Sequence, residues 1–436
     1  MLSVCLCYAQ NKKTLLLSDS LIISISLDHN LLIKQAEKAY DKSVAELRQS
    51  KEWIFPDIYA GARMHQLSGA AMNAEGALLT GIDRSSSWAG IGANALWNPG
   101  NGLLSVQRAK AQSSASMYEL SSIKNKTILK VLELYYSWLK EKSKLKVLNE
   151  LNESSSKLLG QLKLQSEVGR LYQSEYLMAQ SNHAHYELMA SNTEMQIHKI
   201  VSKLRLALNV ADSIVLSTSS NLEPINEDIA YVDEAYSLRP ELANVNSRLK
   251  SKSKEITAYR ASFALPSIQV NTYQALFGEY QLNLYNTNEL NVSLLWRFSL
   301  GEILSRGNMR SLNAEYQSLS YLREYVESSL KSELSTLYFN WLKARKDIKV
   351  SLTALEAARK SHSQTLARQV LRTAKPFEVF QAQGEDAVLE HVGEVSGMEG
   401  VAVIHASAIA FLRQRFHRPH RRGMLKTRLA TGRALA

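Results

Sequence analysis

Cysteine is almost absent from this 436-residue chain. The only two cysteines are Cys5 and Cys7, so the rest of the chain has neither a disulfide framework nor a thiolate metal site. The sequence also lacks an HExxH motif, a glycine-rich phosphate loop and any Cys/His ligand spacing. We therefore expect no metal, no cofactor and no catalytic centre, and a protein that is not an enzyme.

Proline is missing from two long stretches. None lies between Pro99 and Pro224, and none lies between Pro266 and Pro376. Because proline removes a backbone donor and breaks helix interiors, these gaps permit very long helices. The chain also lacks any uninterrupted run of 18 apolar residues, so a transmembrane helix is not expected.

Acidic residues are missing from the end of the chain. Residues 401–436 carry seven arginines, one lysine and no acidic residue, which accounts for eight of the eleven net positive charges. The remaining body is nearly balanced in charge, so no nucleic-acid partner is expected for it.

The first nine residues, MLSVCLCYA, are apolar and end in small residues at the positions that a signal peptidase requires, Cys7 and Ala9. They are too few for a full signal peptide and lack its basic start. We interpret residues 1–9 as a truncated signal peptide, and the alternative is an ordinary N-terminus.

Two segments in the first half alternate apolar and polar residues with the period of a β-strand, residues 54–65 and 88–97. A helix is expected before them, at residues 19–52. The stretch between them, at about 68–86, is rich in Gly, Ser and Asn, and is expected to be a loop.

Residues 103–209 have helical spacing and are interrupted at Gly169, so they predict two long helices. A helix of about 60 residues is roughly 90 Å long, which is too long for a compact core. Four residues follow coiled-coil spacing: Ile128, Leu132, Tyr135 and Leu139. Trp138 and Trp341 are expected to be buried in helix packing. Residues 211–234 are expected to be a linker.

The second half repeats this order. Strands are expected at 267–277 and 289–299, and a long helix at 308–374. Leu134–Lys140 resembles Leu337–Lys343 at an offset of 203 residues, and Glu175, Ala179 and Gln180 match Glu378, Ala382 and Gln383 at the same offset. We therefore predict two structural repeats, residues 10–210 and 235–383, each reading helix, strand, strand, long helix, helix.

The alternation predicts a sheet with one apolar and one polar face. Such a sheet either packs on a core or forms a barrel in lipid with a polar lumen. Strands of about ten residues can span a bilayer, but four of them cannot close a useful barrel, so several chains must contribute. Charged residues of the polar face are expected to face the lumen, and the alternative is that they are ordinary solvated residues: Asp57, Arg63, His65 and Arg297.

Several short motifs resemble those of the TolC-like outer-membrane efflux proteins. Leu238–Leu242 resembles the helix start LRPEL of that family. Phe55–Ile58 and Leu265–Ile268 resemble its paired helix-to-strand entries. Glu167–Leu177 and Phe377–Gln383 resemble its hairpin-tip motif. The order and duplication of these motifs carry the resemblance.

The resemblance covers about residues 15–383 and implies a mainly α fold with β: a trimeric, twelve-stranded β-barrel in the cell outer membrane and an α-helical coiled-coil tunnel that extends into the periplasm. The homotrimer would be the passive duct of a tripartite efflux or type I secretion system, for small molecules, metals or proteins. Its partners would be outer-membrane lipid, a periplasmic adaptor and an inner-membrane pump. The implied adaptor-contacting residues of the hairpin tip are Val168, Gly169, Leu171 and Ser174.

The likeness ends abruptly near Gln383. Residues 384–436 are rich in glycine and then in arginine, and we interpret them as a divergent or frameshifted basic tail. A different function, a soluble coiled-coil scaffold with a basic nucleic-acid-binding tail, would also explain the helices and the tail. It does not explain four alternating strands at equivalent places in two repeats.

Overall fold

The computed structural model describes most of the chain between residues 14 and 386. The expected signal peptide at residues 1–9, most of the linker at 211–234 and the tail from residue 387 onward lie outside the described residues. The described segments are 14–73, 75–211, 215–218, 235–279, 283–298, 300–371, 378–379 and 381–386.

The chain divides into two compact units that are each assembled from segments distant in sequence. We call Glu37–Leu120 with Pro240–Val326 the strand unit. We call Met1–Ala36, Ser121–Arg239 and Glu327–Ala436 the helical unit.

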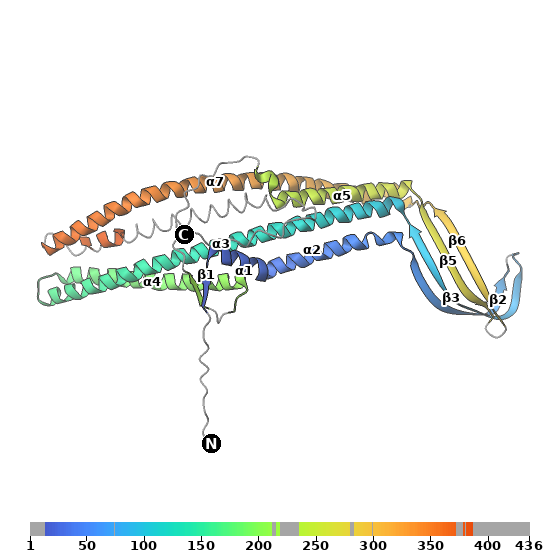
Figure 1. Cartoon of the computed structure of the whole chain (residues 1–436), viewed down its shortest axis with the longest axis horizontal. Helices are drawn as coiled ribbons and strands as arrows, with labels where there is room; N and C mark the ends of the chain where they lie inside the picture. The colour runs from blue at the N-terminus through green and yellow to red at the C-terminus, as the bar shows by residue number, and fades with distance from the viewer. Residues whose placement is uncertain are drawn as a thin grey trace, which may run out of the picture. The chain divides into compact units, whose positions relative to one another are not determined.

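The strand unit contains a four-stranded antiparallel sheet with the order β2-β3-β5-β6. The four strands lie side by side in Figure 1, with β2 and β6 at the two edges. Their bounds are Asp57–Met72 for β2, Leu78–Trp97 for β3, Ser267–Gly278 for β5 and Leu284–Leu295 for β6.

The structure corrects two expectations about the strands. Residues 68–86 are not a long loop, because β2 and β3 continue through them to a tight turn at Asn73, whose side-chain oxygen accepts from the amides of Glu75 and Ala77 at 3.1 and 2.8 Å. The small polar residues of this stretch show no alternation of apolar and polar side chains, but backbone hydrogen bonds between β2 and β3 hold the hairpin together. The last strand ends at Leu295, whereas the sequence placed it at 289–299.

Two helices occupy the region expected to form one helix at residues 19–52, namely α1 (Asp19–His29) and α2 (Leu31–Gln49). Asn30 separates them with extended backbone angles. A short 3-10 turn, η1 (Glu52–Ile54), leads into β2.

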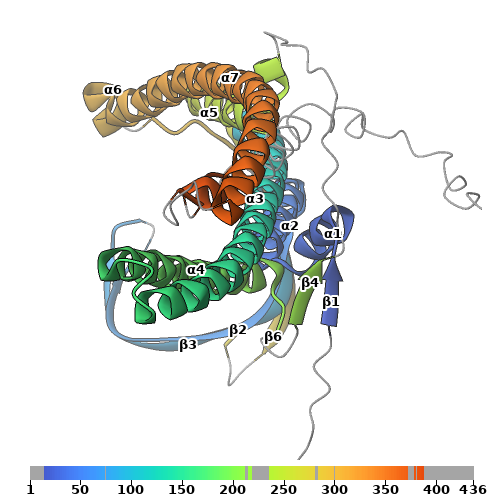
Figure 2. The same cartoon turned by 90° about the vertical axis from the view of Figure 1, so that its left-hand side faces the viewer.

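The longest helix is α3 (Pro99–Glu167), with 69 residues. Asn98 caps its start by accepting from the Asn101 amide at 3.1 Å, and Pro99 takes the first helical position, where no amide is needed. The helix ends because Gly169 adopts a left-handed conformation with φ of 71°. Helix α4 (Gln173–Leu208) then returns along α3 in the helical unit, as Figure 2 shows.

The second half contributes three more helices, α5 (Pro240–Ala264), α6 (Leu300–Ser305) and α7 (Gly307–Val370). A 3-10 turn, η2, covers Ala235–Leu238. Two short strands, β1 (Thr14–Leu17) and β4 (Val215–Thr218), form a separate parallel pair in the helical unit.

The core of the helical unit lies where β1, α1, α3 and α4 meet. The predicted coiled-coil positions are buried here, and so is Trp138, which is 4% exposed. Trp341 of α7 is also buried, which confirms the predicted packing role of both tryptophans. The main cluster consists of Leu17, Ile22, Ile128, Val131, Leu132, Tyr135, Tyr136, Trp138, Leu139, Leu204 and Leu208.

We expect Asn30 to be a stability determinant of the helical unit. Its side chain caps α2 by accepting from the amides of Leu32 and Ile33, and it donates to the Ala207 carbonyl at 2.7 Å. The change Asn30→Ala should lower the free energy of unfolding by about 2–3 kcal/mol, because it removes a cap and a buried hydrogen bond. Asn30→Ser keeps an acceptor for the cap and should lose less. Urea unfolding followed by circular dichroism checks both, and an unchanged midpoint for Asn30→Ala contradicts the expectation.

Candidate functional site

The register of the sheet places the predicted polar residues of β2 on one face. Asp57, Arg63 and His65 pair directly with Asn94, Trp88 and Ser86 of β3, and alternate positions along a strand share a face. All three side chains are exposed. The expectation that Arg297 lies within the last strand is wrong, because β6 ends two residues before it, at Leu295.

Aromatic side chains bridge the strands on this polar face. Tyr59 donates from its hydroxyl to the Asn271 side chain of β5 at 3.3 Å, although β3 lies between their strands. Tyr273 donates to the Glu289 carboxylate of β6. The rings of Tyr273 and Trp88 meet edge to face, with centroids 5.8 Å apart.

A glycine makes the longest of these bridges possible. A Cβ at Gly92 would lie 2.5 Å from the Tyr59 ring, so the ring crosses β3 directly over this residue. Sequence reasoning missed this arrangement. The available signal was the alternation of Gly90 and Gly92 in a strand, which marks close approach.

The opposite face of the sheet is apolar and open. Ile58 is 83% exposed and Leu290 is 69% exposed, although both belong to regular strands. A contiguous apolar surface of this kind marks a membrane or protein contact. We define the apolar face by its apolar residues, among which Thr272 and Gln274 of β5 also lie: Ile58, Ala60, Ala62, Met64, Ala89, Ile91, Ala93, Ala95, Trp97, Ile268, Val270, Leu290, Val292 and Leu294.

The apolar face crosses the strands obliquely. Ile58, the first apolar residue of β2, is in register with Leu290, at which the unbroken apolar run of β6 (Leu290, Val292 and Leu294) ends. The midpoints of the two apolar runs are therefore displaced by about five residues of ~3.3 Å over three strand spacings of ~4.8 Å. If the apolar residues lie in one plane perpendicular to the axis of a barrel, the strands tilt by roughly 45–50° from that axis. This is near the value for strands that cross a bilayer.

The hairpin tip between α3 and α4 separates its predicted residues into two kinds. Val168 is 69% exposed and Ser174 is exposed as well, so both are available to a partner. Leu171 instead packs against the Leu162 cluster, and Gly169 forms the left-handed turn. Sequence reasoning missed Tyr172, which is 80% exposed directly after that turn.

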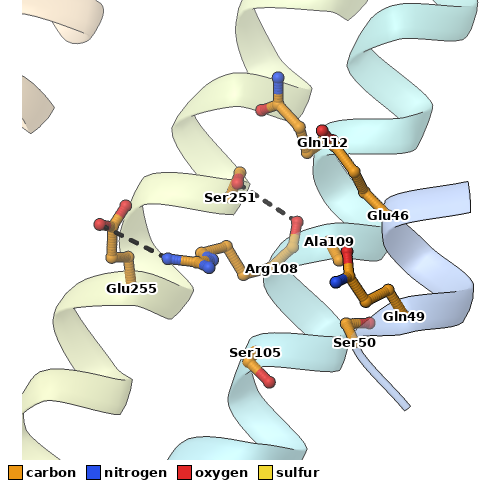
Figure 3. Close-up of a pocket in the computed structure, with 9 residues that line it drawn as sticks. All are labelled: Glu46, Gln49, Ser50, Ser105, Arg108, Ala109, Gln112, Ser251 and Glu255. Atoms are coloured by element: carbon orange, nitrogen blue, oxygen red, sulfur yellow. Dashed lines mark hydrogen bonds and ion pairs between the residues drawn. The ribbon is translucent and has the colours of Figure 1, made fainter. Parts of the chain in front are cut away.

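An open pocket of about 530 Å³ lies in the strand unit between α2, α3 and α5 (Figure 3). Its charges are largely paired, because Arg108 lies 3.6 Å from Glu255, and Glu46 lies 3.7 Å from Lys42. The pocket therefore offers no unpaired charge to an ionic ligand. Its lining residues are Glu46, Gln49, Ser50, Ser105, Arg108, Ala109, Gln112, Ser251 and Glu255.

A second charge network ties α5 to α7 within the strand unit. Lys252 lies 2.9 Å from Glu255 and 2.5 Å from Glu315. Burial lowers the pKa of Lys252, but its hydrogen bonds to the two carboxylates outweigh burial and raise the pKa above its ordinary value. The ammonium therefore stays charged and serves as a structural cross-link.

In the described part of the chain, no cluster of His, Cys, Asp and Glu could hold a metal ion. Among the described helices, none combines the length and apolarity needed to cross a membrane.

The fold is similar to that of solved outer-membrane channels. The outer membrane protein VceC from Vibrio cholerae has a TM-score of 0.77 at 12% identity, over 90% of this chain and 95% of that one. The CmeC outer membrane channel of Campylobacter jejuni has a TM-score of 0.74 at 13% identity, over 90% and 85%. The open MtrE outer membrane channel of Neisseria gonorrhoeae has a TM-score of 0.72 at 13% identity, over 90% and 88%. No protein-family model and no curated protein sequence matches the chain. The predicted fold, mainly helical with antiparallel strands, is confirmed.

Proposed function

We propose that the chain belongs to the TolC-like family and is one protomer of an outer-membrane channel, with no enzymatic activity. The observation that carries this proposal is the sheet, which has an exposed apolar face, a polar face and two edges that no other described strand pairs with. In lipid, an unpaired edge leaves backbone groups without partners, so the sheet requires further strands. Exposure of so large an apolar face to water is unfavourable, so the face is expected to contact lipid or another protein.

Three copies of the sheet would form a barrel of twelve strands, with Asp57, Arg63 and His65 toward the lumen. The long helices would extend into the periplasm. Two structural repeats, residues 10–210 and 235–383, would supply equivalent hairpins to this assembly. The channel would serve a tripartite efflux or type I secretion system as a passive duct for small molecules, metals or proteins.

The hairpin tip would meet a periplasmic adaptor that links the channel to an inner-membrane pump. The change Val168→Asp places a charge on an exposed apolar contact and should reduce export about tenfold or more, since a buried unpaired charge costs several kcal/mol. Assembly should be unchanged. The control is Leu206→Asp, at an exposed branched aliphatic residue of the same helical hairpin away from the tip; Leu206 is 79% exposed and Val168 is 69% exposed. Export assays in cells that lack the native channel measure the effect, and equal activity of both variants contradicts a role for Val168.

Membrane fractionation of the full-length protein, expressed with a complete signal sequence, tests the proposal. The expected result is a trimer in the outer-membrane fraction on an unheated gel after cross-linking. A water-soluble protein that shifts DNA in a gel would instead support the scaffold with a basic tail. If assembly fails but is rescued by a regular final helix, the fault lies in the tail at residues 384–436.

A further inference from the structure

The two edges of the sheet are matched to each other. β2 and β6 run antiparallel to one another, because three antiparallel pairings separate them. The β6 edge of one copy can therefore pair with the β2 edge of a second copy and continue the antiparallel order around a ring.

We propose that these edges join in one defined register, in which Arg297 of one copy lies opposite Asp57 of the next copy, and Glu289 lies opposite His65. This inference rests on the proposed function, because it needs a ring of copies. It goes beyond that function by assigning the residue pairs that close the ring.

Charge complementarity on the polar face supports this register. Both acidic side chains on the edge strands, Asp57 and Glu289, meet a basic group of the other copy. Arg63 becomes the diagonal neighbour of Glu289, within reach of its long side chain. No ion pair within the described residues engages Asp57, Arg63, His65 or Arg297.

On the apolar face, too, the residues of the two edges are complementary in this register. Each of the four β2 residues on the apolar face meets an apolar residue of the next copy, with alanines opposite the branched Leu294 and Val292. The change from apolar to polar also occurs at the same row on both edges. The rows are Ile58 with Trp296, Ala60 with Leu294, Ala62 with Val292, Met64 with Leu290, Gln66 with Asn288, and Ser68 with Asn286.

Neighbouring registers break apolar pairs on the apolar face, and the shift that sets Arg63 opposite Glu289 leaves Asp57 opposite Leu295. A shift of two residues in one direction sets Met64 against Asn288, and the opposite shift sets Gln66 against Leu290. Either shift also removes Arg297 from its place opposite Asp57. A shift of one residue brings the polar face of one copy to the apolar face of the next.

The geometry of the sheet agrees with this register. Within one copy, Asp57 is in register with Asn291, whereas across the edge it meets Arg297, six residues farther along. Six residues of ~3.3 Å over four strand spacings of ~4.8 Å give a tilt of about 45°, which is a common tilt for barrel strands. The obliquity of the apolar face within one copy gives nearly the same tilt.

The contact requires a small extension of β6. The strand ends at Leu295 in the single chain, so pairing must extend it through Trp296 and Arg297. Both side chains are exposed and Trp296 is 53% exposed, so neither has to leave a packed core.

Cysteine cross-linking tests the register. In a full-length protein with Cys5→Ser and Cys7→Ser, the pairs Met64→Cys with Leu290→Cys and Gly61→Cys with Ser293→Cys lie opposite each other, one on each face. Directly opposite residues alternate between hydrogen-bonded and non-hydrogen-bonded pairs, and these differ in the separation of their Cβ atoms. The two cysteine pairs belong to different kinds, so at least one should form disulfides. The expected result is a series of covalent oligomers, up to the complete ring, on a heated, non-reducing gel.

Matched controls keep Met64→Cys and move its partner by two residues, to Val292→Cys or Asn288→Cys. These should remain monomers on the same gel. Efficient cross-linking of a shifted pair, or of neither in-register pair in a protein that is oligomeric on an unheated gel, overturns the register and leaves the channel intact. A protein that forms no oligomer overturns the proposed function itself.

A charge exchange provides an independent readout. Asp57→Arg and Arg297→Asp should each lower the temperature at which the oligomer dissociates, because each sets like charges opposite each other. The double variant should restore that temperature. Failure of the double variant to restore it contradicts the pairing of these two residues.

Discussion

The change Gly90→Ala should destabilise the strand unit by about 3 kcal/mol, a large effect for one added methyl group. A Cβ at Gly90 would lie 2.4 Å from the Ala275 Cβ and 2.4 Å from the Gln274 carbonyl oxygen. Backbone atoms cannot rotate away as a side chain can, so β3 and β5 would have to separate.

Gly160→Ala is the matched control for this prediction. Gly160 lies in α3, where an added Cβ meets nothing within 4 Å. Because glycine is a poor residue in a helix interior, alanine there should raise the free energy of unfolding by about 0.5–1 kcal/mol. Urea unfolding of both variants in detergent gives the comparison. Similar midpoints for the two variants contradict the close approach at Gly90.

The change Leu132→Ala should lower the stability of the helical unit by about 2–5 kcal/mol. Leu132 is 1% exposed and lies in the cluster where α1, α3 and α4 meet. The lost methyl groups leave a cavity that the long helices cannot close without bending.

Leu206→Ala controls for the same chemical change at the surface. Leu206 is 79% exposed on α4, so its truncation should alter stability by no more than about 0.5 kcal/mol. Thermal unfolding by circular dichroism measures both variants. A small loss for Leu132→Ala refutes the assignment of the cluster as the main core.

The sequence predicted those features that depend on local periodicity. Alternation alone identified the apolar residues of β2, β3 and β6, and the register placed those that lie within the strands on one face, whereas Trp296 and Phe298 lie beyond the end of β6. The absence of proline predicted the long helices, and Gly169 predicted the turn between α3 and α4. Each of these signals lies within a short window of the chain.

The sequence failed where structure depends on pairing between distant segments. The continuation of β2 and β3 through residues 68–86 rests on cross-strand hydrogen bonds between small polar residues, which carry no hydrophobic alternation. The contact between Tyr59 and Asn271 spans three strands and requires the full register. The position of Arg297 outside β6 depends on where the pairing with β5 ends.

The break at Asn30 illustrates a third case. A polar residue in a helical pattern is ordinarily tolerated on the solvent side, so residues 19–52 read as one helix. In the structure its side chain instead caps α2 and binds the end of α4, and this tertiary hydrogen bond ends α1.

The conductance of planar lipid bilayers with the purified, assembled full-length protein tests the central claim most directly. The account predicts stepwise current increases of uniform size as single oligomers insert, because a polar lumen of closed strands conducts ions. An oligomer of intact secondary structure that inserts into bilayers but conducts no current, or that remains in water without detergent, would contradict the claim that this chain builds a channel.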